Sequence, residues 1–179
     1  VLSHYWDFDN GDISLQEDTS YTFPTFGNYA VSFVAENDFG CRDTSTGEIV
    51  VMPLPTVAIS IDTGCHGQLT VFHDESVVNP GTIGTLEWDL DNNGTFDSTS
   101  SDPSFLYNSS ASHRVRLRVT TDFGCLNIDS FDFNPHPLPV PAFTQSSDSI
   151  CAGDSLVITN TSTGAVSYEF DFGDGSAPL

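Results

Sequence analysis

Residues 87–91 read Glu-Trp-Asp-Leu-Asp, and this short pattern decides the fold because it recurs along the chain. Residues 5–9 read Tyr-Trp-Asp-Phe-Asp, and residues 169–175 read Glu-Phe-Asp-Phe-Gly-Asp-Gly. Each aromatic anchor lies 82 positions after the one before it, which indicates an internal repeat. We predict that these anchors fill the centres of successive domain cores: Trp6, Trp88 and Phe170.

Other motifs keep a similar spacing. Residues 37–41, Asn-Asp-Phe-Gly-Cys, return at residues 121–125 with Thr in place of Asn. Residues 52–55 and 136–141 are rich in proline, which cannot continue a sheet ladder, so they predict semi-rigid connectors. We interpret the chain as a stretch of a longer one, with the C-terminal part of one domain, a complete domain and the N-terminal part of a third: residues 1–54, 55–137 and 138–179.

Alternating apolar residues with period two, and turn residues every eight to twelve positions, predict an all-β sandwich. In residues 113–120 this alternation directs Val115, Leu117 and Val119 to the core, and in the first copy Val31, Phe33 and Ala35 are expected to do the same. The expected strands of the complete domain lie near residues 56–62, 67–73, 84–90, 95–99, 103–107, 113–120 and 126–133.

Composition limits the possible functions. The chain has 25 acidic residues against four Arg and no Lys, a formal net charge of −21. Such a surface repels nucleic acid and anionic membranes, and it attracts divalent cations. No apolar run has the length of a membrane span, so no membrane insertion is expected in this segment. Scattered His and abundant carboxylates form no catalytic arrangement, so we expect no enzyme activity.

Several of these motifs resemble the signatures of PKD domains. Residues 6–9 and 170–175 resemble the aromatic-Asp-Phe-Gly-Asp-Gly turn, and residues 26–31 resemble the Gly-x-Tyr-x-Val strand. The resemblance implies tandem immunoglobulin-like sandwiches joined by short proline-rich linkers. The Gly-Cys ending of the hairpin, together with the Ile-Cys-Ala-Gly-Asp motif of residues 150–154, is similar to copies in long Bacteroidota surface proteins, including gliding-motility adhesins of the SprB kind.

The middle copy departs from this pattern at one strand. His113 stands where the first copy has Tyr29, and Ala111 replaces Gly27. We therefore expect the entry to this strand to differ while the fold stays the same.

Residues 89–97 match most of a calcium-binding loop. Oxygen-bearing side chains stand at positions 1, 3, 5 and 9, with glycine at position 6. The twelfth position, normally Glu, is Ser100, so Asp102 or water would have to complete the site. The alternative is a polar turn held by side-chain hydrogen bonds to the backbone. The candidate calcium ligands are Asp89, Asp91, Asn93, the Thr95 carbonyl and Asp97.

The four cysteines have no zinc-site spacing, and in a lysine-free acidic β-protein they predict disulfides and an oxidising exterior. In an immunoglobulin-like sandwich, the turn after the first strand and the last hairpin lie at opposite ends, beyond the reach of one disulfide. We therefore favour inter-domain bonds with partners mostly outside this segment. Intra-repeat pairing and free thiols remain alternatives. The residues concerned are Cys41, Cys65, Cys125 and Cys151.

Three arginines alternate along one strand, facing solvent: Arg114, Arg116 and Arg118. They could form a contact patch for an acidic neighbour or an anionic polysaccharide. The alternative is cross-strand pairing with the chain's own carboxylates.

Together these patterns favour a structural or adhesive segment of a long secreted cell-surface protein, a stalk or filament for attachment or gliding. Its expected partners are neighbouring repeats, and surface polysaccharide or other surface proteins. The alternative is an accessory spacer or polysaccharide-binding module of a secreted hydrolase. For a carbohydrate-binding module, the repeated aromatic candidates are Phe39 and Phe123.

Overall fold

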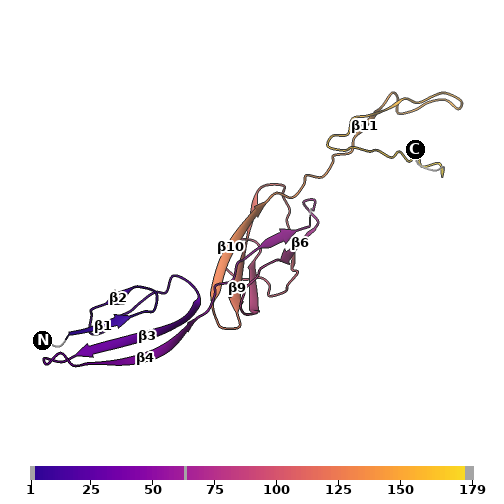
Figure 1. Ribbon diagram of the computed structural model, residues 1–179. Coiled ribbons are helices and arrows are strands. Elements are labelled where there is room, and N and C mark those ends of the chain that lie inside the picture. Colours follow the sequence, from indigo (N-terminus) through magenta and orange to yellow (C-terminus); the bar gives the residue numbers. More distant parts are fainter. Residues whose placement is uncertain (1–2, 63, 176–179) are drawn as a thin grey trace. The chain divides into compact units, whose positions relative to one another are not determined.

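The computed structural model describes residues 3–62 and 64–175, and these residues form strands and turns without a helix (Figure 1), which confirms the all-β prediction. The described residues group into two compact units, one from residues 1–60, 73–103 and 114–131, and one from residues 61–72, 104–113 and 132–179. The strands are β1 (Ser3–Asp7), β2 (Ile13–Ser14), β3 (Gly27–Glu36), β4 (Arg42–Val51), β5 (Ile59–Ile61), β6 (Leu69–Asp74), β7 (Ile83–Asp89), β8 (Ser104–Leu106), β9 (His113–Thr121), β10 (Leu126–Phe133), β11 (Phe143–Gln145) and β12 (Ile158–Asn160).

The first unit contains an antiparallel sheet with the strand order β2-β1-β3-β4 (Figure 1). In this sheet Trp6 of β1 lies opposite Phe33 of β3, and the two ring centroids are 4.7 Å apart. The indole N–H of Trp6 points to the Glu17 carbonyl oxygen at 3.4 Å. Trp6 therefore links the β1–β3 strand pair to the segment around Glu17, which follows β2.

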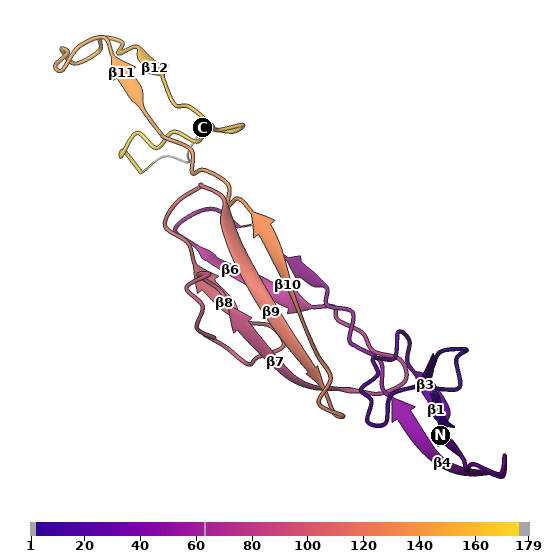
Figure 2. The ribbon, with the colours of Figure 1, turned by 90° about the vertical axis from the view of Figure 1, so that its left-hand side faces the viewer.

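A second sheet with the order β10-β9-β7 repeats this arrangement (Figure 2). Trp88 of β7 lies opposite Leu117 of β9, and its indole N–H donates to the Ser100 carbonyl at 2.9 Å. The register of this pair shifts between Ile83 and Thr85, at Gly84. A Cβ at Gly84 would lie 3.2 Å from the backbone of Thr121, so any other residue would require that backbone to move by a few tenths of an ångström.

The second unit holds most of the β5-β6-β8 sheet and the β11-β12 pair. Phe72 of β6 packs edge-on against Phe133 of β10, with ring centroids 5.4 Å apart, and Tyr107 contacts Phe133 at 5.0 Å. All three side chains are buried. Because β6 and β10 belong to different sheets, this aromatic cluster joins the inner faces of two sheets, as in a β-sandwich.

Two hairpins share one geometry. In residues 37–41 the Asn37 N–H donates to the Cys41 carbonyl at 3.0 Å, and the Gly40 N–H donates to the Asn37 carbonyl at 3.0 Å. In residues 121–125 the Thr121 N–H donates to the Cys125 carbonyl at 2.9 Å, and the Gly124 N–H donates to the Thr121 carbonyl at 3.0 Å. Gly40 and Gly124 have φ values of 78° and 82°, which only glycine adopts without strain. The sequence motif thus encodes one turn, used twice.

The strand pairs at residues 56–77 and 140–163 also match bond for bond. Thr56 and Val77 exchange backbone hydrogen bonds of 2.8 and 3.0 Å, and Val140 and Thr163 exchange bonds of 2.9 and 3.0 Å. The N–H groups of Ala58 and Ala142 donate to the hydroxyls of Ser76 and Ser162, and those of Asp62 and Ser146 donate to the carbonyls of Val71 and Val157.

The substitution at His113 leaves the local geometry intact. The Tyr29 hydroxyl donates to the Thr25 carbonyl at 2.9 Å, and His113 Nε2 lies 3.2 Å from the Ser109 carbonyl, also four residues upstream. The rings also pack alike in tilted pairs, with Tyr29 4.4 Å from Phe23 and His113 4.5 Å from Tyr107 between ring centroids. Consistent with a changed entry, β9 begins at His113, whereas β3 begins at Gly27.

Two expectations differ from the structure. Residues 95–99 form only an isolated bridge between Ser98 and Trp88 instead of a strand, because the polar loop before them uses its hydrogen bonds within itself. Val115, Leu117 and Val119 are 0% exposed as expected, and so is Trp88. Their counterparts Val31, Phe33 and Trp6 are only half-buried, however, and Ala35 is exposed. Phe170 is half-buried as well.

Truncation of Leu117 tests the core. Leu117→Ala should lower the free energy of unfolding by about 2–5 kcal/mol, since it leaves a cavity among fully buried neighbours. Urea unfolding monitored by Trp88 fluorescence, in a Trp6→Phe background, would measure this loss. Leu126→Ala is the matched control, because Leu126 is 54% exposed and should lose less than about 1 kcal/mol. Equal losses would show that Leu117 is not a core residue.

Candidate functional site

Three carboxylates gather at the end of β7. Oxygen atoms of Asp89, Asp91 and Asp97 all lie within 4.8 Å of one another. Asp89 is 1% exposed, whereas Asp91 and Asp97 face solvent. The cation nearest to Asp89 is Arg116, whose Nη1 lies 4.0 Å from Asp89 Oδ2. Each of these three carboxylates could give one oxygen ligand to a divalent cation.

The loop also holds itself together without a cation. Asp89 accepts the backbone N–H groups of Asn93 and Gly94, both at 3.0 Å, and Asp97 accepts that of Leu90 at 2.7 Å. Two backbone positions have positive φ, Asn92 at 57° and Gly94 at 90°. The loop is therefore also the polar turn that we considered as the alternative.

The other predicted ligands are tied to each other. Asp91 accepts both the backbone and the side-chain N–H of Asn93, at 3.1 and 2.9 Å. The Asn93 side-chain oxygen accepts the Thr95 backbone N–H at 2.7 Å and is also bonded by the Thr95 hydroxyl. Asn93 therefore needs a rotation before its oxygen can serve as a metal ligand.

Asp102, which we expected as a residue that could complete the loop, is engaged elsewhere. Its Oδ1 lies 2.7 Å from His73 Nδ1, and its Oδ2 accepts the Ser101 hydroxyl at 2.8 Å. The bond to His73, helped by Ser101, lowers the pKa of Asp102. The pairing joins residues 29 positions apart, which sequence spacing alone does not reveal.

In the corresponding loop of the first copy, residues 7–12, two carboxylates accept hydrogen bonds from residues later in the chain. Asp9 accepts the Ala30 N–H of β3 at 2.9 Å, and Asp12 accepts the Tyr21 hydroxyl. This bond to Asp12 raises the pKa of the Tyr21 phenol. The carboxylates at this loop thus bind backbone and phenol groups of neighbouring segments.

Two of the cysteines lie beside the proline-rich segments of residues 52–55 and 136–141. Cys125 Sγ is 4.0 Å from the Met52 carbonyl oxygen, whereas Cys65 forms a bridge with His136, whose N–H donates to Gly64 at 2.9 Å. All four cysteines are free thiols in the structure, Cys41 and Cys151 exposed and the other two half-buried.

The arginines of β9 face carboxylates of β7. Arg118 Nη2 lies 2.5 Å from Glu87 Oε2, directly across the strand pair, and Arg116 faces Asp89 in the same way. The Arg118 guanidinium also lies 4.3 Å from the centroid of the Phe96 ring. Sequence reasoning missed Phe96, although an aromatic residue inside a polar loop signals a packing partner. The third arginine, Arg114, is exposed.

The two hairpin tips carry phenylalanine. Phe39 is 92% exposed and Phe123 is 55% exposed. Phe123 lies beside Gly81, where an added Cβ would meet its ring at 3.6 Å. The repeated position therefore has different surroundings in the two copies.

None of the described segments forms a helix with the length and hydropathy that crossing a bilayer requires.

Similar solved structures include the PKD1 domain of Vibrio anguillarum Epp, with a TM-score of 0.42, 23% identity, and 49% of this chain and 99% of that chain covered. The PKD1 domain of the Vibrio cholerae metalloprotease PrtV has a TM-score of 0.41 and 24% identity, over 47% and 99%. Fibronectin(III)-like modules of Clostridium thermocellum CbhA have a TM-score of 0.41 and 13% identity, over 75% and 78%.

A protein-family comparison matches residues 1–50 to the PKD domain. This match covers β1 to β3 and nearly all of β4, including the Trp6 anchor and the strand that begins at Gly27. The match supports a PKD-type domain in this part of the all-β chain, where the described strands form the sheet β2-β1-β3-β4.

Proposed function

We propose that this chain is a structural and adhesive segment of a long secreted cell-surface protein, a stalk of tandem PKD-type repeats that serves attachment or gliding. The observation that carries the proposal is the bond-for-bond match between residues 56–77 and residues 140–163. A chain that reuses one local structure at regular intervals extends its length without acquiring new chemistry.

Contacts at the first connector support a stalk. The Asn127 side-chain amide of β10 donates to the Pro55 carbonyl at 3.0 Å, and Cys125 lies beside Met52. Proline at residues 53 and 55 limits the backbone to extended conformations. A connector held by its own domain and stiffened by proline transmits tension better than a flexible linker.

A second candidate function is an accessory polysaccharide-binding module of a secreted hydrolase. The observation that favours it is the nearly complete exposure of Phe39, because sugar rings stack on exposed aromatic side chains. The two candidates imply the same partners: neighbouring repeats, surface polysaccharide and other surface proteins. Both place the segment outside the cell, and neither gives it a catalytic role.

Co-sedimentation with insoluble chitin and cellulose separates the two candidates. The stalk proposal predicts that the chain stays in the supernatant, and that single-molecule pulling gives a discrete unfolding event. Residues 55–137 span about 300 Å when extended at about 3.6 Å per residue, so subtracting roughly 40–50 Å for the folded length leaves a contour-length gain of roughly 250 Å. Sedimentation with the polysaccharide that Phe39→Ala abolishes would instead support the accessory module.

Disulfides between adjacent repeats extend the stalk proposal. Cys125 lies beside the connector before the middle copy, and Cys65 lies beside the connector after it. The eight residues of β10 separate Cys125 from the second connector, which corresponds to roughly 26 Å of strand. A disulfide requires Cα atoms within about 7 Å, so each cysteine pairs with a neighbouring repeat.

Oxidation of the purified chain with glutathione disulfide tests this pairing. Each of the four thiols should accept one glutathione by thiol–disulfide exchange, which releases one reduced glutathione per adduct. Intact mass spectrometry should therefore find four adducts per chain. An intrachain Cys65–Cys125 bond, lost in Cys125→Ser, would contradict the inter-repeat pairing.

Calcium binding at Asp89, Asp91 and Asp97 completes the proposal. The carboxylates at this loop lie within 4.8 Å of one another, a spacing that suits one hard cation with oxygen ligands. Bound calcium would offset two of the three negative charges and rigidify the turn between the Trp88 strand and residue 98.

The calcium proposal predicts a higher melting temperature in calcium than in EDTA. For a dissociation constant of about 10⁻⁴–10⁻³ M, about 10 mM Ca²⁺ adds about 1.4–2.7 kcal/mol of stability. Asp97→Asn should abolish this difference, since it removes a charge but keeps an oxygen for the Leu90 N–H. Asp129→Asn, on an exposed strand position, is the matched control. Identical melting of the wild type in calcium and EDTA would exclude the site.

A further inference from the structure

The loops that follow the two tryptophan strands each contain an asparagine followed by glycine, Asn10–Gly11 and Asn93–Gly94. All four residues are exposed. The φ values of Gly11 and Gly94 are 92° and 90°, so the two pairs share one backbone conformation. Glycine has no side chain that would hinder attack of its backbone nitrogen on the asparagine before it. Both pairs therefore have the covalent structure that favours deamidation.

The asparagine side chains are also held in the same way. Asn10 Oδ1 accepts the backbone N–H of Asp12 at 3.1 Å, and Asn93 Oδ1 accepts that of Thr95 at 2.7 Å. Such a bond keeps the side chain over the following peptide and polarises its carbonyl group, whose carbon is the atom that the glycine nitrogen attacks. The asparagines themselves thus do not distinguish the two loops.

The two loops differ at the glycine N–H. The Gly94 N–H donates to Asp89 Oδ2 at 3.0 Å, and Asp89 is 1% exposed. For the Gly11 N–H, the described part of the chain holds no acceptor within hydrogen-bond distance. Asp7 stands in the place of Asp89, but it accepts the Asp9 N–H at 2.9 Å instead. The nitrogen that would react is therefore engaged in the middle copy and open to solvent in the first.

Loop length explains this difference. Three residues separate Trp6 from Asn10, and four separate Trp88 from Asn93. The extra residue, Asn92, has a φ of 57°, and the N–H groups after it turn back to the carboxylate that opens the loop. All the groups compared belong to the loops themselves, so the difference does not depend on residues outside them.

We propose that Asn10 is a site of spontaneous deamidation and that Asp89 protects Asn93 from the same reaction. Hydroxide takes the proton of the Gly11 N–H, and the nitrogen forms a bond with Cγ of Asn10. The bond from Cγ to Nδ2 breaks as water protonates the leaving nitrogen, so ammonia departs and a succinimide remains. Water then opens this ring at Cγ, which gives aspartate, or at the main-chain carbonyl, which gives isoaspartate. At Asn93 the first step requires the Gly94 N–H to leave Asp89, whose negative charge also disfavours loss of the proton.

Deamidation would change how the first loop is held. The Asn10 side-chain amide donates to the Tyr21 hydroxyl at 2.7 Å, and this hydroxyl donates to Asp12. A carboxylate at residue 10 removes the amide donor and adds a second acceptor beside a hydroxyl that has one proton to give. The bond to Asp12 raises the pKa of the Tyr21 phenol and the amide of Asn10 lowers it, so deamidation should raise this pKa further. The modification is independent of the adhesive role proposed above.

Peptide mapping of the full chain by mass spectrometry, after incubation at mildly alkaline pH, tests the proposal. EDTA is present throughout, so that calcium does not compete for Asp89. Asn10 should be converted to aspartate and isoaspartate at least about tenfold faster than Asn93, because a hydrogen bond to a charged group must first break at the second site. In denaturing urea, where this bond is lost, the two rates should become similar.

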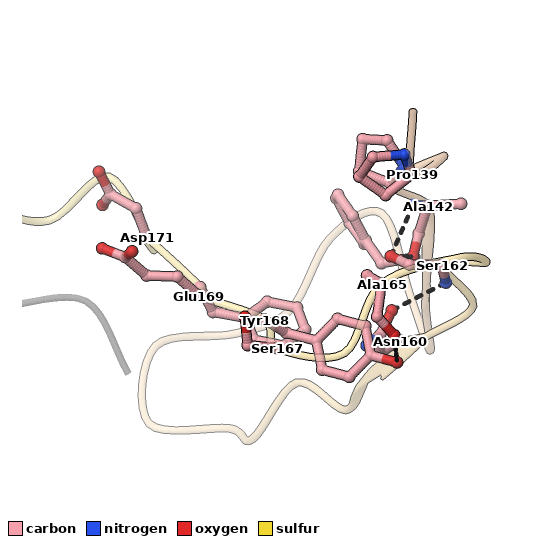
Figure 3. A pocket seen from close by; sticks show the side chains of 12 residues that line it. Pro139, Ala142, Asn160, Ser162, Ala165, Ser167, Tyr168, Glu169 and Asp171 are labelled. Carbon is pink, nitrogen blue, oxygen red and sulfur yellow. Dashed lines mark hydrogen bonds between the residues drawn. The ribbon is translucent and has the colours of Figure 1, made fainter. Parts of the chain in front are cut away.

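Asn160 is the internal reference (Figure 3). Its Oδ1 accepts the Ser162 N–H at 2.8 Å, as in the two loops, but the residue between them is threonine. The Thr161 N–H donates to the Ala142 carbonyl at 2.9 Å, and its branched side chain hinders the attack. Asn160 should therefore stay unmodified while Asn10 reacts.

Two alanine variants separate the contributions of the carboxylates. Asp89→Ala should raise the rate at Asn93 towards that at Asn10, whereas Asp7→Ala, the matched control, should change the rate at Asn10 little. Trp88 fluorescence checks that the Asp89→Ala chain folds, and if it does not, the comparison of folded and urea-treated wild type decides. Equal conversion of the two asparagines in the folded wild type, or an unmodified Asn10 under conditions that convert it in urea, would overturn the proposal.

Discussion

The register between the aromatic strand and the alternating apolar strand is the constraint on which the other features depend. Trp88 opposite Leu117 places both side chains in the core, and it also places Glu87 and Asp89 opposite Arg118 and Arg116. A slip of one residue would turn every one of these side chains to the other face. The acidic loop begins where this strand ends, so the same register fixes the position of the buried carboxylate of Asp89.

The repeat takes up a change of length between its paired strands. Trp88 follows Trp6 by 82 positions, but Leu117 follows Phe33 by 84. Residues are therefore gained in the segment between the two paired strands while the pairing itself is kept. The physical reason is that lengthening a loop costs little closure entropy, whereas a shifted register exposes a whole apolar face.

Much of this structure follows from local sequence patterns, and what does not follow depends on distant contacts. The strand at residues 126–133 has the predicted bounds, because alternation and flanking turns define it. Residues 95–99 do not form a full strand, since the adjacent polar loop uses its hydrogen bonds internally. The spacing of oxygen-bearing residues brings Asp89, Asp91 and Asp97 together, but the capture of Asp102 by His73 depends on a contact across 29 residues. The half-open core around Phe33 likewise depends on which strands cover it.

The arrangement of the arginines has a consequence for proteolysis. The chain has no lysine, and three of its four arginines lie on β9, between β7 and β10. Proteases that cut after cationic residues need an extended, unpaired substrate, so these three bonds are protected while the sheet is intact. The remaining bond follows Arg42, the first residue of β4. A chain built in this way limits the bonds open to trypsin-like enzymes through composition as well as folding.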